Sequence, residues 1–284
     1  MPTFLHKHLR VQGKQVLPGF TLSLGVSLLF ISLILLLPIT GLIVQTSSMS
    51  WQEYWLVISD PRVVASYRVT FLMALGASLI NGVLGLLLAW VLVRYHFFGK
   101  RLIDAMIDLP FALPTAIAGL TLVTLFAENG WYGQLLSQVG IQVAYAPAGI
   151  LVAMLFTSLP FVVRSVQPVL EDLAQEDEEA ALSLGASDLT VFRRVLFPAL
   201  WPALLMGVSL SLIRSLGEFG AIIFIAGNMP YLTEVTSLMI FIRLQEFDYA
   251  AASAIASVIL LTSLTALLLI NIWQTRYLKR IQGR

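Results

Sequence analysis

Arg214 and Glu218 are the residues of this sequence whose types and spacing most directly suggest chemistry. Both are ionisable, yet they lie in an apolar stretch that covers residues 197–228. Ionisable residues inside a membrane are costly and usually face a bundle interior or a wet cavity. Two interpretations stay open. The pair could neutralise itself and fix a break in a helix, or it could line a translocation gate and meet an anion in transit.

The glycines around this pair predict a break in the helix. Gly217 and Gly220 bracket Glu218. A straight helix over residues 197–228 would be about 46 Å long, well beyond a bilayer core of ~30 Å. On a continuous helix, residues four apart can pair with each other. The candidate pathway or gate residues are therefore Arg214, Gly217, Glu218 and Gly220.

A polar segment at residues 179–202, EAALSLGASDLTVFRRVLFPALWP, is the second candidate, and it lies between two long apolar stretches. The region 164–194 holds seven acidic residues and three arginines. Gly185 is a suitable end for a first helix, and Ser187 or Asp188 can cap a second one. The segment therefore predicts a short helix–turn–helix on the aqueous side of a membrane.

The second of these helices is expected over residues 189–196, with Pro198 and Pro202 marking the start of the next span. The first helix carries a small apolar patch made of Ala180, Ala181 and Leu184. From the residues alone, this patch either docks into a groove on a partner or packs on its own bundle.

No residue set typical of an enzyme or of a metal site accompanies these segments. The three histidines, His6, His8 and His96, lie in polar flanks, and the chain has no cysteine. It contains neither G-x-S-x-G nor the phosphate-binding G-x-x-x-x-G-K-[ST] motif. We therefore expect no catalysis, no metal, no cofactor and no ATP binding by this chain.

The composition indicates a membrane protein. The 284 residues are 58% hydrophobic and 12% charged, whereas soluble domains carry about 25% charged residues. Charges are clustered, and the uncharged runs between them approach or exceed the ~20 residues that cross a bilayer as a helix. The first run is too long for a cleavable signal core and is expected to be an ordinary span. We predict an all-α polytopic protein with six spans, near residues 17–44, 69–93, 109–126, 147–163, 197–226 and 250–273.

The basic residues predict the orientation of these spans. If the N-terminus is cytoplasmic, thirteen of the 17 lysines and arginines lie in inner segments, three lie in outer segments, and Arg214 lies within a span. Inner loops of membrane proteins are enriched in basic residues. Both termini and the loop between spans four and five are therefore expected in the cytoplasm. The net charge of +1 then reflects topology and predicts no nucleic-acid partner.

No linker or soluble segment divides the chain, so one membrane domain is expected over residues 1–284, with a core at about 65–275 and a cytoplasmic loop at 164–196. Asp108 can cap the third span. Pro114 and Pro160 are expected to kink the third and fourth spans.

The polar segment resembles the signature loop of ABC importer permeases, which has Glu-Ala-Ala, three residues, Gly, nine residues, then Ile-x-Leu-Pro. The departures are Val195 for Ile and Phe197 for Leu, both apolar. The resemblance implies the type I permease fold and a loop whose helices insert into an ATPase subunit, which binds the ATP. The matching residues, and the candidates for ATPase coupling, are Glu179, Ala180, Ala181, Gly185, Val195 and Pro198.

Over nearly its whole length the chain also resembles the T-type subunits of sulfate/thiosulfate permeases. This resemblance implies a heteromer with a W-type permease subunit, two ABC ATPase subunits and a periplasmic sulfate- or thiosulfate-binding protein, in a bacterial inner membrane. A molybdate or tungstate permease is the alternative, because the Gly-Glu-Phe-Gly block resembles both groups. A secondary anion transporter is more remote, since no internal repeat is evident. The stretches that carry the resemblance are residues 17–30, 108–122, 160–173, 214–228 and 233–260.

Overall fold

The computed structural model describes residues 19–282, and it describes the side chains of all of these except 175 and 277–282. All regular secondary structure in this part of the chain is helical, so the predicted all-α class is confirmed. Five segments are long and apolar enough to cross a membrane: Phe20–Ser47, Pro61–Arg94, Pro147–Asp172, Asp188–Leu216 and Tyr249–Arg276.

These five segments are built from the longest helices. The first consists of α1 (Phe20–Ile31) and α2 (Leu37–Ser47), joined by the π-helical turn η1 (Ser32–Leu36). The others contain α4 (Pro61–Arg94), α9 (Pro147–Asp172), α12 (Phe197–Leu216) and α15 (Tyr249–Gln282). Between them lie α3 (Trp51–Ile58), α5 (Lys100–Ile107), α6 (Leu109–Ala112), α7 (Thr115–Phe126), α8 (Trp131–Ser137), α10 (Gln175–Ser183), α11 (Asp188–Val191), η2 (Phe192–Leu196), α13 (Ile222–Ile225) and α14 (Thr236–Gln245).

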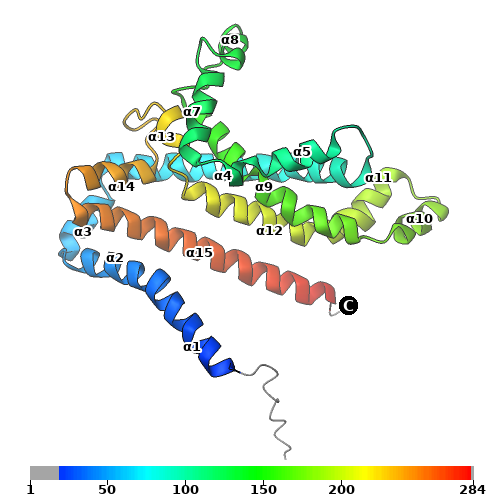
Figure 1. Cartoon of the computed structure of the whole chain (residues 1–284), viewed down its shortest axis with the longest axis horizontal. Helices are drawn as coiled ribbons and strands as arrows, with labels where there is room; N and C mark the ends of the chain where they lie inside the picture. The colour runs from blue at the N-terminus through cyan, green and yellow to red at the C-terminus, as the bar shows by residue number, and fades with distance from the viewer. Residues whose placement is uncertain (1–18, 283–284) are drawn as a thin grey trace, which may run out of the picture.

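The long helices lie side by side and give the bundle two distinct ends (Figure 1). One end carries α10, α11 and the last turn of α4, and we call it the loop end. The opposite end, the far end, carries α3, α14 and the first turn of α4. Both α4 and α9 end at the loop end, whereas α12 begins there, so residues far apart in the sequence meet at each end.

The predicted third span is wrong as a single helix. Residues 109–126 form α6 and α7, separated by Leu113 in an extended conformation and by Pro114. The ring of a proline disfavours the helical conformation of the residue before it, so the expected kink is a full interruption. With 12 residues, α7 is about 18 Å long and does not cross a bilayer core by itself. It projects from the bundle and carries α8 near its tip (Figure 1). Pro160, unlike Pro114, does not interrupt its helix, and α9 continues through it.

Close contact among α4, α9 and α12 forms the centre of the bundle. A Cβ atom added to Gly85 on α4 would lie 2.7 Å from the Cβ of Val162 on α9, and one added to Gly207 on α12 would lie 2.8 Å from the Cα of Val162. Val162 is completely buried between these two glycines. Small residues allow membrane helices to approach closely, which explains the presence of glycine at both positions.

Replacement of Gly85 by leucine is expected to destabilise the bundle. The new side chain would overlap Val162, and forced overpacking costs about 1–3 kcal/mol. The measurement is the unfolding midpoint of the detergent-solubilised protein in a denaturant series. Gly25 in α1 has no atom within 4 Å of an added Cβ, so Gly25→Leu is the control and should leave the midpoint unchanged. Equal midpoints for both variants would contradict the packing role.

A buried polar cluster further fixes the same three helices. The side-chain nitrogen of Asn81 on α4 donates to Ser158 Oγ on α9 at 2.9 Å and to the carbonyl of Leu155 at 3.1 Å. The hydroxyls of Ser211 and Ser215 on α12 also donate to Ser158 Oγ, at 2.9 and 3.1 Å. Hydrogen bonds between helices in a bilayer contribute on average about 0.6 kcal/mol each. The cluster therefore sets the relative positions of α4, α9 and α12 more than it adds stability.

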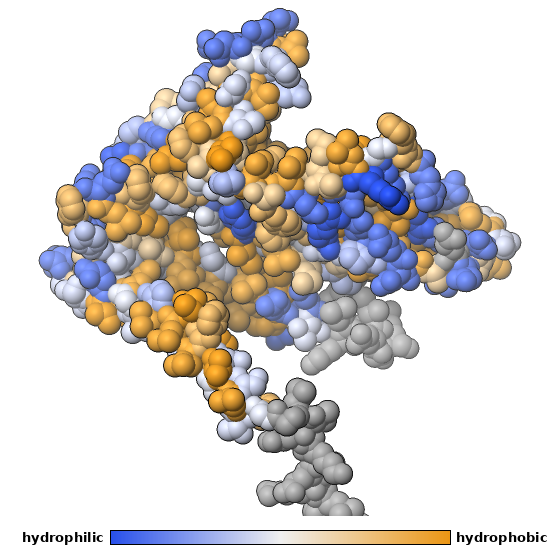
Figure 2. Space-filling view, in the orientation of Figure 1, coloured by the Kyte–Doolittle hydropathy of each residue, from blue (hydrophilic) through white to orange (hydrophobic). Residues whose placement is uncertain are grey.

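The first apolar segment lies at the edge of this bundle. None of the residues of α1 or α2 is buried, and Figure 2 shows apolar side chains over both helices. Contact with the rest of the chain is made by α2 against α15. At the far end Tyr54 of α3 hydrogen-bonds to Ser257 of α15 at 3.0 Å, and Arg62 pairs with the buried Glu234 at 2.5 Å. The outward apolar surface is consistent with a lipid environment.

Candidate functional site

The predicted helix–turn–helix is formed by α10, the turn at residues 184–187 and the helix that begins with α11. After α10 the chain turns at Gly185, which has φ +81°. The backbone N–H of Ala186 donates to Ala181 at 3.1 Å, and that of Gly185 donates to Leu182 at 2.9 Å. These two bonds are the Schellman arrangement, in which a residue with left-handed conformation ends a helix. The predicted role of Gly185 as the end of the first helix is confirmed.

The second helix of this loop differs from the prediction in its length. It begins after Ser187, whose hydroxyl hydrogen-bonds to Thr190 Oγ1 at 2.9 Å instead of capping a backbone N–H. It does not end before Pro198, but continues from α11 through η2 into α12. Pro198 lies in the first turn of α12, where α12 follows a π-helical turn. Helical backbone therefore runs from the loop directly into a span.

The apolar patch of the loop faces away from the bundle. Leu184 is 90% exposed, and Ala180 and Leu189 are also exposed. Ala181, the third residue of the patch, is half-buried, and Figure 1 shows α10 at the extreme loop end. Of the other candidates, Glu179 and Pro198 are exposed, and Val195 is half-buried. Of the six candidate coupling residues, three lie on α10, Gly185 lies in the turn after it, and Val195 and Pro198 lie in η2 and in the first turn of α12.

The break at Gly217 lies as predicted, directly after α12. Arg214 and Glu218 pair across it, with 2.7 Å between Nη1 and Oε2. Glu218 is 1% exposed, and its Oε1 accepts the backbone N–H of Ala221 at 3.0 Å. The side chain of Arg214 is 33% exposed. The carboxylate is therefore fixed inside the protein, while the guanidinium can also reach a group outside it.

The two glycines of this break have different roles. A Cβ atom on Gly220 would lie 2.1 Å from Thr115 Oγ1 at the start of α7, whereas one on Gly217 would meet nothing within 4 Å. Nearby, a Cβ on Gly119 of α7 would lie 2.5 Å from the carbonyl oxygen of Ala221. The interruption before α7 and the break after α12 therefore pack directly against each other, and only Gly220 is required by this contact.

Four ion pairs that sequence reasoning missed join residues far apart in the sequence. Arg164 on α9 donates to both oxygens of Asp108, at 2.9 and 2.7 Å, and to Asp104 Oδ1 at 2.7 Å. Asp108 therefore binds Arg164, and the predicted cap at the third span is wrong. Arg94 on α4 pairs with Glu178 on α10. The fourth is the Arg62–Glu234 pair. The partners of these pairs are 56 to 172 positions apart, so no local sequence pattern predicts them.

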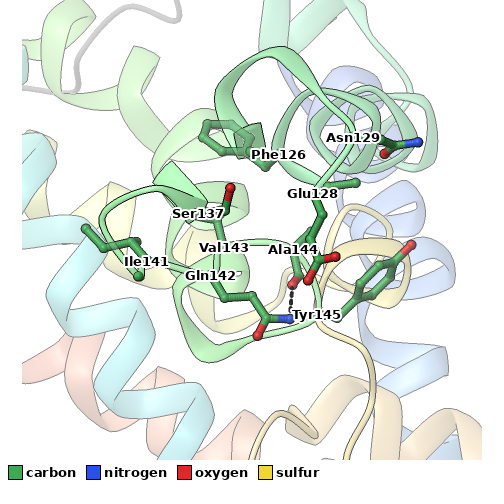
Figure 3. Close-up of a pocket in the computed structure, with 12 residues that line it drawn as sticks. Phe126, Glu128, Asn129, Ser137, Ile141, Gln142, Val143, Ala144 and Tyr145 are labelled. Carbon is green, nitrogen blue, oxygen red and sulfur yellow. Dashed lines mark hydrogen bonds between the residues drawn. The ribbon is translucent and has the colours of Figure 1, made fainter. Parts of the chain in front are cut away.

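A cavity of about 710 Å³ lies where α7, α8 and the start of α9 are joined. Figure 3 shows Glu128, Ser137 and Gln142 around it, and Gln142 donates to the carbonyl of Ala144 at 3.3 Å. None of the candidate residues lines it. Its only charged lining residue is Glu128, and a carboxylate without a neighbouring cation disfavours an anion. The cavity is therefore a poor site for an anionic cargo.

A bundle of apolar spans with an exposed loop and a broken helix is typical of a membrane transport protein, and comparison with known proteins identifies its family. Residues 81–283 match the family described as binding-protein-dependent transport system inner membrane component. The chain belongs to this family. It is 63% identical to the sulfate transport system permease protein CysT of Salmonella typhimurium over 275 residues, which are 97% of this chain and 99% of that protein. It is 62% identical to CysT of Escherichia coli, over 96% of this chain and 99% of that protein.

Solved structures give the same fold. A chain of a bacterial ABC transporter involved in the import of the acidic polysaccharide alginate superposes with a TM-score of 0.75 and 17% identity, covering 91% of this chain and 96% of that chain. A chain of the MetNI methionine ABC transporter in an inward-facing conformation gives a TM-score of 0.57 at 19% identity, covering 82% and 99%. The predicted ABC importer permease fold is confirmed.

Proposed function

We propose that this chain is a transmembrane permease subunit of an ATP-driven importer that moves sulfate or thiosulfate from the periplasm to the cytoplasm. The observation that carries the proposal is the match to CysT proteins from end to end, at 63% and 62% identity. The subunit itself is non-catalytic and needs no cofactor. ATP is bound and hydrolysed by a partner, because this sequence contains no nucleotide-binding motif.

The loop between α9 and α12 is the proposed coupling element. Its exposed Leu184 and Ala180 offer apolar surface to a groove on an ATPase, and the turn at Gly185 holds the two helices of the loop at a fixed angle. Val195 and Pro198 lie where the loop joins α12, so that movement of the ATPase reaches a span directly. Glu179 and Ala181 complete the proposed contact.

The break after α12 is the proposed gate. Arg214 is paired with Glu218, yet it remains partly exposed, which suits a group that meets a passing dianion without trapping it. Gly217 and Gly220 provide the unwound backbone at this point. Tight binding of the cargo is not required of a permease, since tight binding would slow release.

The assembly and its location complete the proposal. Basic residues at the loop end, among them Arg94, Arg193 and Arg276, support a cytoplasmic position for that end and for both termini under the positive-inside rule. The whole chain acts as one membrane domain in a bacterial inner membrane, with its core at about 65–275 and the coupling loop at 164–196. Its proposed partners are a W-type permease subunit, two ABC ATPase subunits and a periplasmic binding protein for sulfate or thiosulfate.

Reconstitution in proteoliposomes tests the proposal. The complex isolated through a tag on this chain is combined with candidate binding proteins, and ATP hydrolysis is measured with sulfate, thiosulfate and molybdate. Stimulation by sulfate or thiosulfate supports the proposed cargo. Stimulation by molybdate alone would assign the chain to the alternative class of oxyanion permease. Uptake that persists without ATP and stops when the proton gradient collapses would indicate a secondary transporter.

A further inference from the structure

The last two turns of α4 each contact the coupling loop. Arg94 donates through Nη2 to Oε1 of Glu178 on α10. The two side chains are only 17% and 20% exposed. Among the residues whose side chains the structure describes, this is the only ion pair that joins α10 to another helix.

A tryptophan one turn earlier supports this ion pair. The guanidinium of Arg94 lies 5.4 Å from the centre of the Trp90 ring, a distance at which a cation is attracted to the face of an aromatic ring. The edge of Trp90 also meets Phe192, with 5.6 Å between ring centres. Phe192 in turn contacts Phe197, which contacts Trp201 on α12. Through two adjacent turns, α4 therefore contacts both α10 and the helix that follows α11.

The position of α10 depends on these contacts for a physical reason. A nine-residue helix is marginal in water by itself, and α10 has no buried residue among those with described side chains. It is joined to α9 through Leu173 and Ala174, both of which have extended conformations. A link of this kind fixes where the helix begins but leaves its direction undetermined.

We propose that the Arg94–Glu178 ion pair is a positioning link, which fixes the direction of α10 relative to α4 and transmits movement of the coupling loop to the bundle centre. Through Gly85 and Asn81, α4 is tightly packed on α9 and α12, so force applied at its last turn reaches all three helices. The inference rests on the proposed function, since it requires that an ATPase moves α10.

The link depends more on the positive charge of residue 94 than on the planar shape of the arginine guanidinium. Its Nε has no hydrogen-bond partner among the described residues, so the bond to Glu178 uses one nitrogen of the guanidinium. A lysine also offers a positive charge and single donors. Arg94→Lys is therefore expected to keep most of the coupling, whereas Arg94→Gln, of similar length but neutral, is expected to lose it.

Charge exchange in the reconstituted complex tests the link. Arg94→Glu and Glu178→Arg are each expected to lower the sulfate taken up per ATP hydrolysed by about tenfold, which corresponds to the loss of one charge-assisted hydrogen bond. The double variant, Arg94→Glu with Glu178→Arg, is expected to restore it. Arg101 is exposed at the same end and has no ion-pair partner among the described residues, so Arg101→Glu is the matched control and should keep the wild-type ratio.

The outcomes separate the two proposals. If the wild-type chain isolates no ATPase, or ATP hydrolysis does not respond to any oxyanion, the proposed function fails. If the wild-type complex is coupled but both single variants keep its ratio, or the double variant is no better than the single ones, the positioning link is wrong. Restoration by the double variant together with a normal Arg101→Glu complex supports the link, because a general loss of folding would not be reversed by a second charge change.

Discussion

Replacement of Gly185 by valine is expected to abolish transport while the chain remains in the membrane. Gly185 has φ +81°, a conformation that costs a residue with a Cβ about 1–2 kcal/mol and costs more for a branched side chain. An added Cβ would meet no atom within 4 Å, so the effect comes from the backbone and not from a clash. The turn would change, and with it the angle between α10 and α11. The measurement is the amount of ATPase subunit that co-purifies with this chain, together with uptake of labelled sulfate.

Gly140 provides a matched control for this variant. It also has positive φ, +74°, and open space around an added Cβ, but it lies between α8 and α9, away from the loop end. Gly140→Val introduces the same strain and should leave ATPase co-purification at the wild-type level. Normal stoichiometry and uptake for Gly185→Val would rule out the coupling role of the turn.

Arg214→Ala is expected to lower sulfate uptake by at least about tenfold, the effect of losing a hydrogen bond to a charged group. The change has two consequences that must be separated. It removes the cation proposed to meet the anion, and it leaves Glu218 buried without its partner. Uncompensated buried charges cost about 3–5 kcal/mol. Uptake by the single variant therefore needs to be compared with the amount of assembled complex.

A double variant separates the gate from a purely structural pair. Glu218→Gln keeps the shape of the side chain and one acceptor for the N–H of Ala221, while it removes the unpaired charge that Arg214→Ala creates. The double variant is expected to assemble like the wild type and still to transport poorly, since the cation is absent. Recovery of uptake in the double variant would favour the pair that only stabilises the break.

The local features of the fold are predictable because they depend on neighbours in the sequence. The break at Gly217 and the Arg214–Glu218 pair follow from glycine placement and from a spacing of four residues. The turn at Gly185 follows from the preference of glycine for left-handed conformations at helix ends. Five of the spans follow from uncharged runs long enough to cross a bilayer.

The features that were missed depend on residues far apart in the sequence. Asp108 is a good cap by local rules, but Arg164 offers two charge-assisted hydrogen bonds, which are stronger than a neutral cap. Pro114 predicts a kink, yet the full interruption also depends on α7 finding a partner in the segment around Ala221. Glu178 is one of seven acidic residues in the loop region, and only the fold selects it for Arg94.

The contact between Gly220 and Thr115 has a mechanical consequence. It places the interruption before α7 and the break after α12 side by side, so backbone that lacks regular helical hydrogen bonds is concentrated at one point of the bundle. Bending α4 or α9 would stretch continuous ladders of backbone hydrogen bonds, whereas rotation at this point would disturb only local bonds, such as the one from the N–H of Ala221 to Glu218 Oε1. The bundle thus combines stiff, unbroken helices with one point of interrupted backbone, and that point carries Arg214, the proposed gate residue.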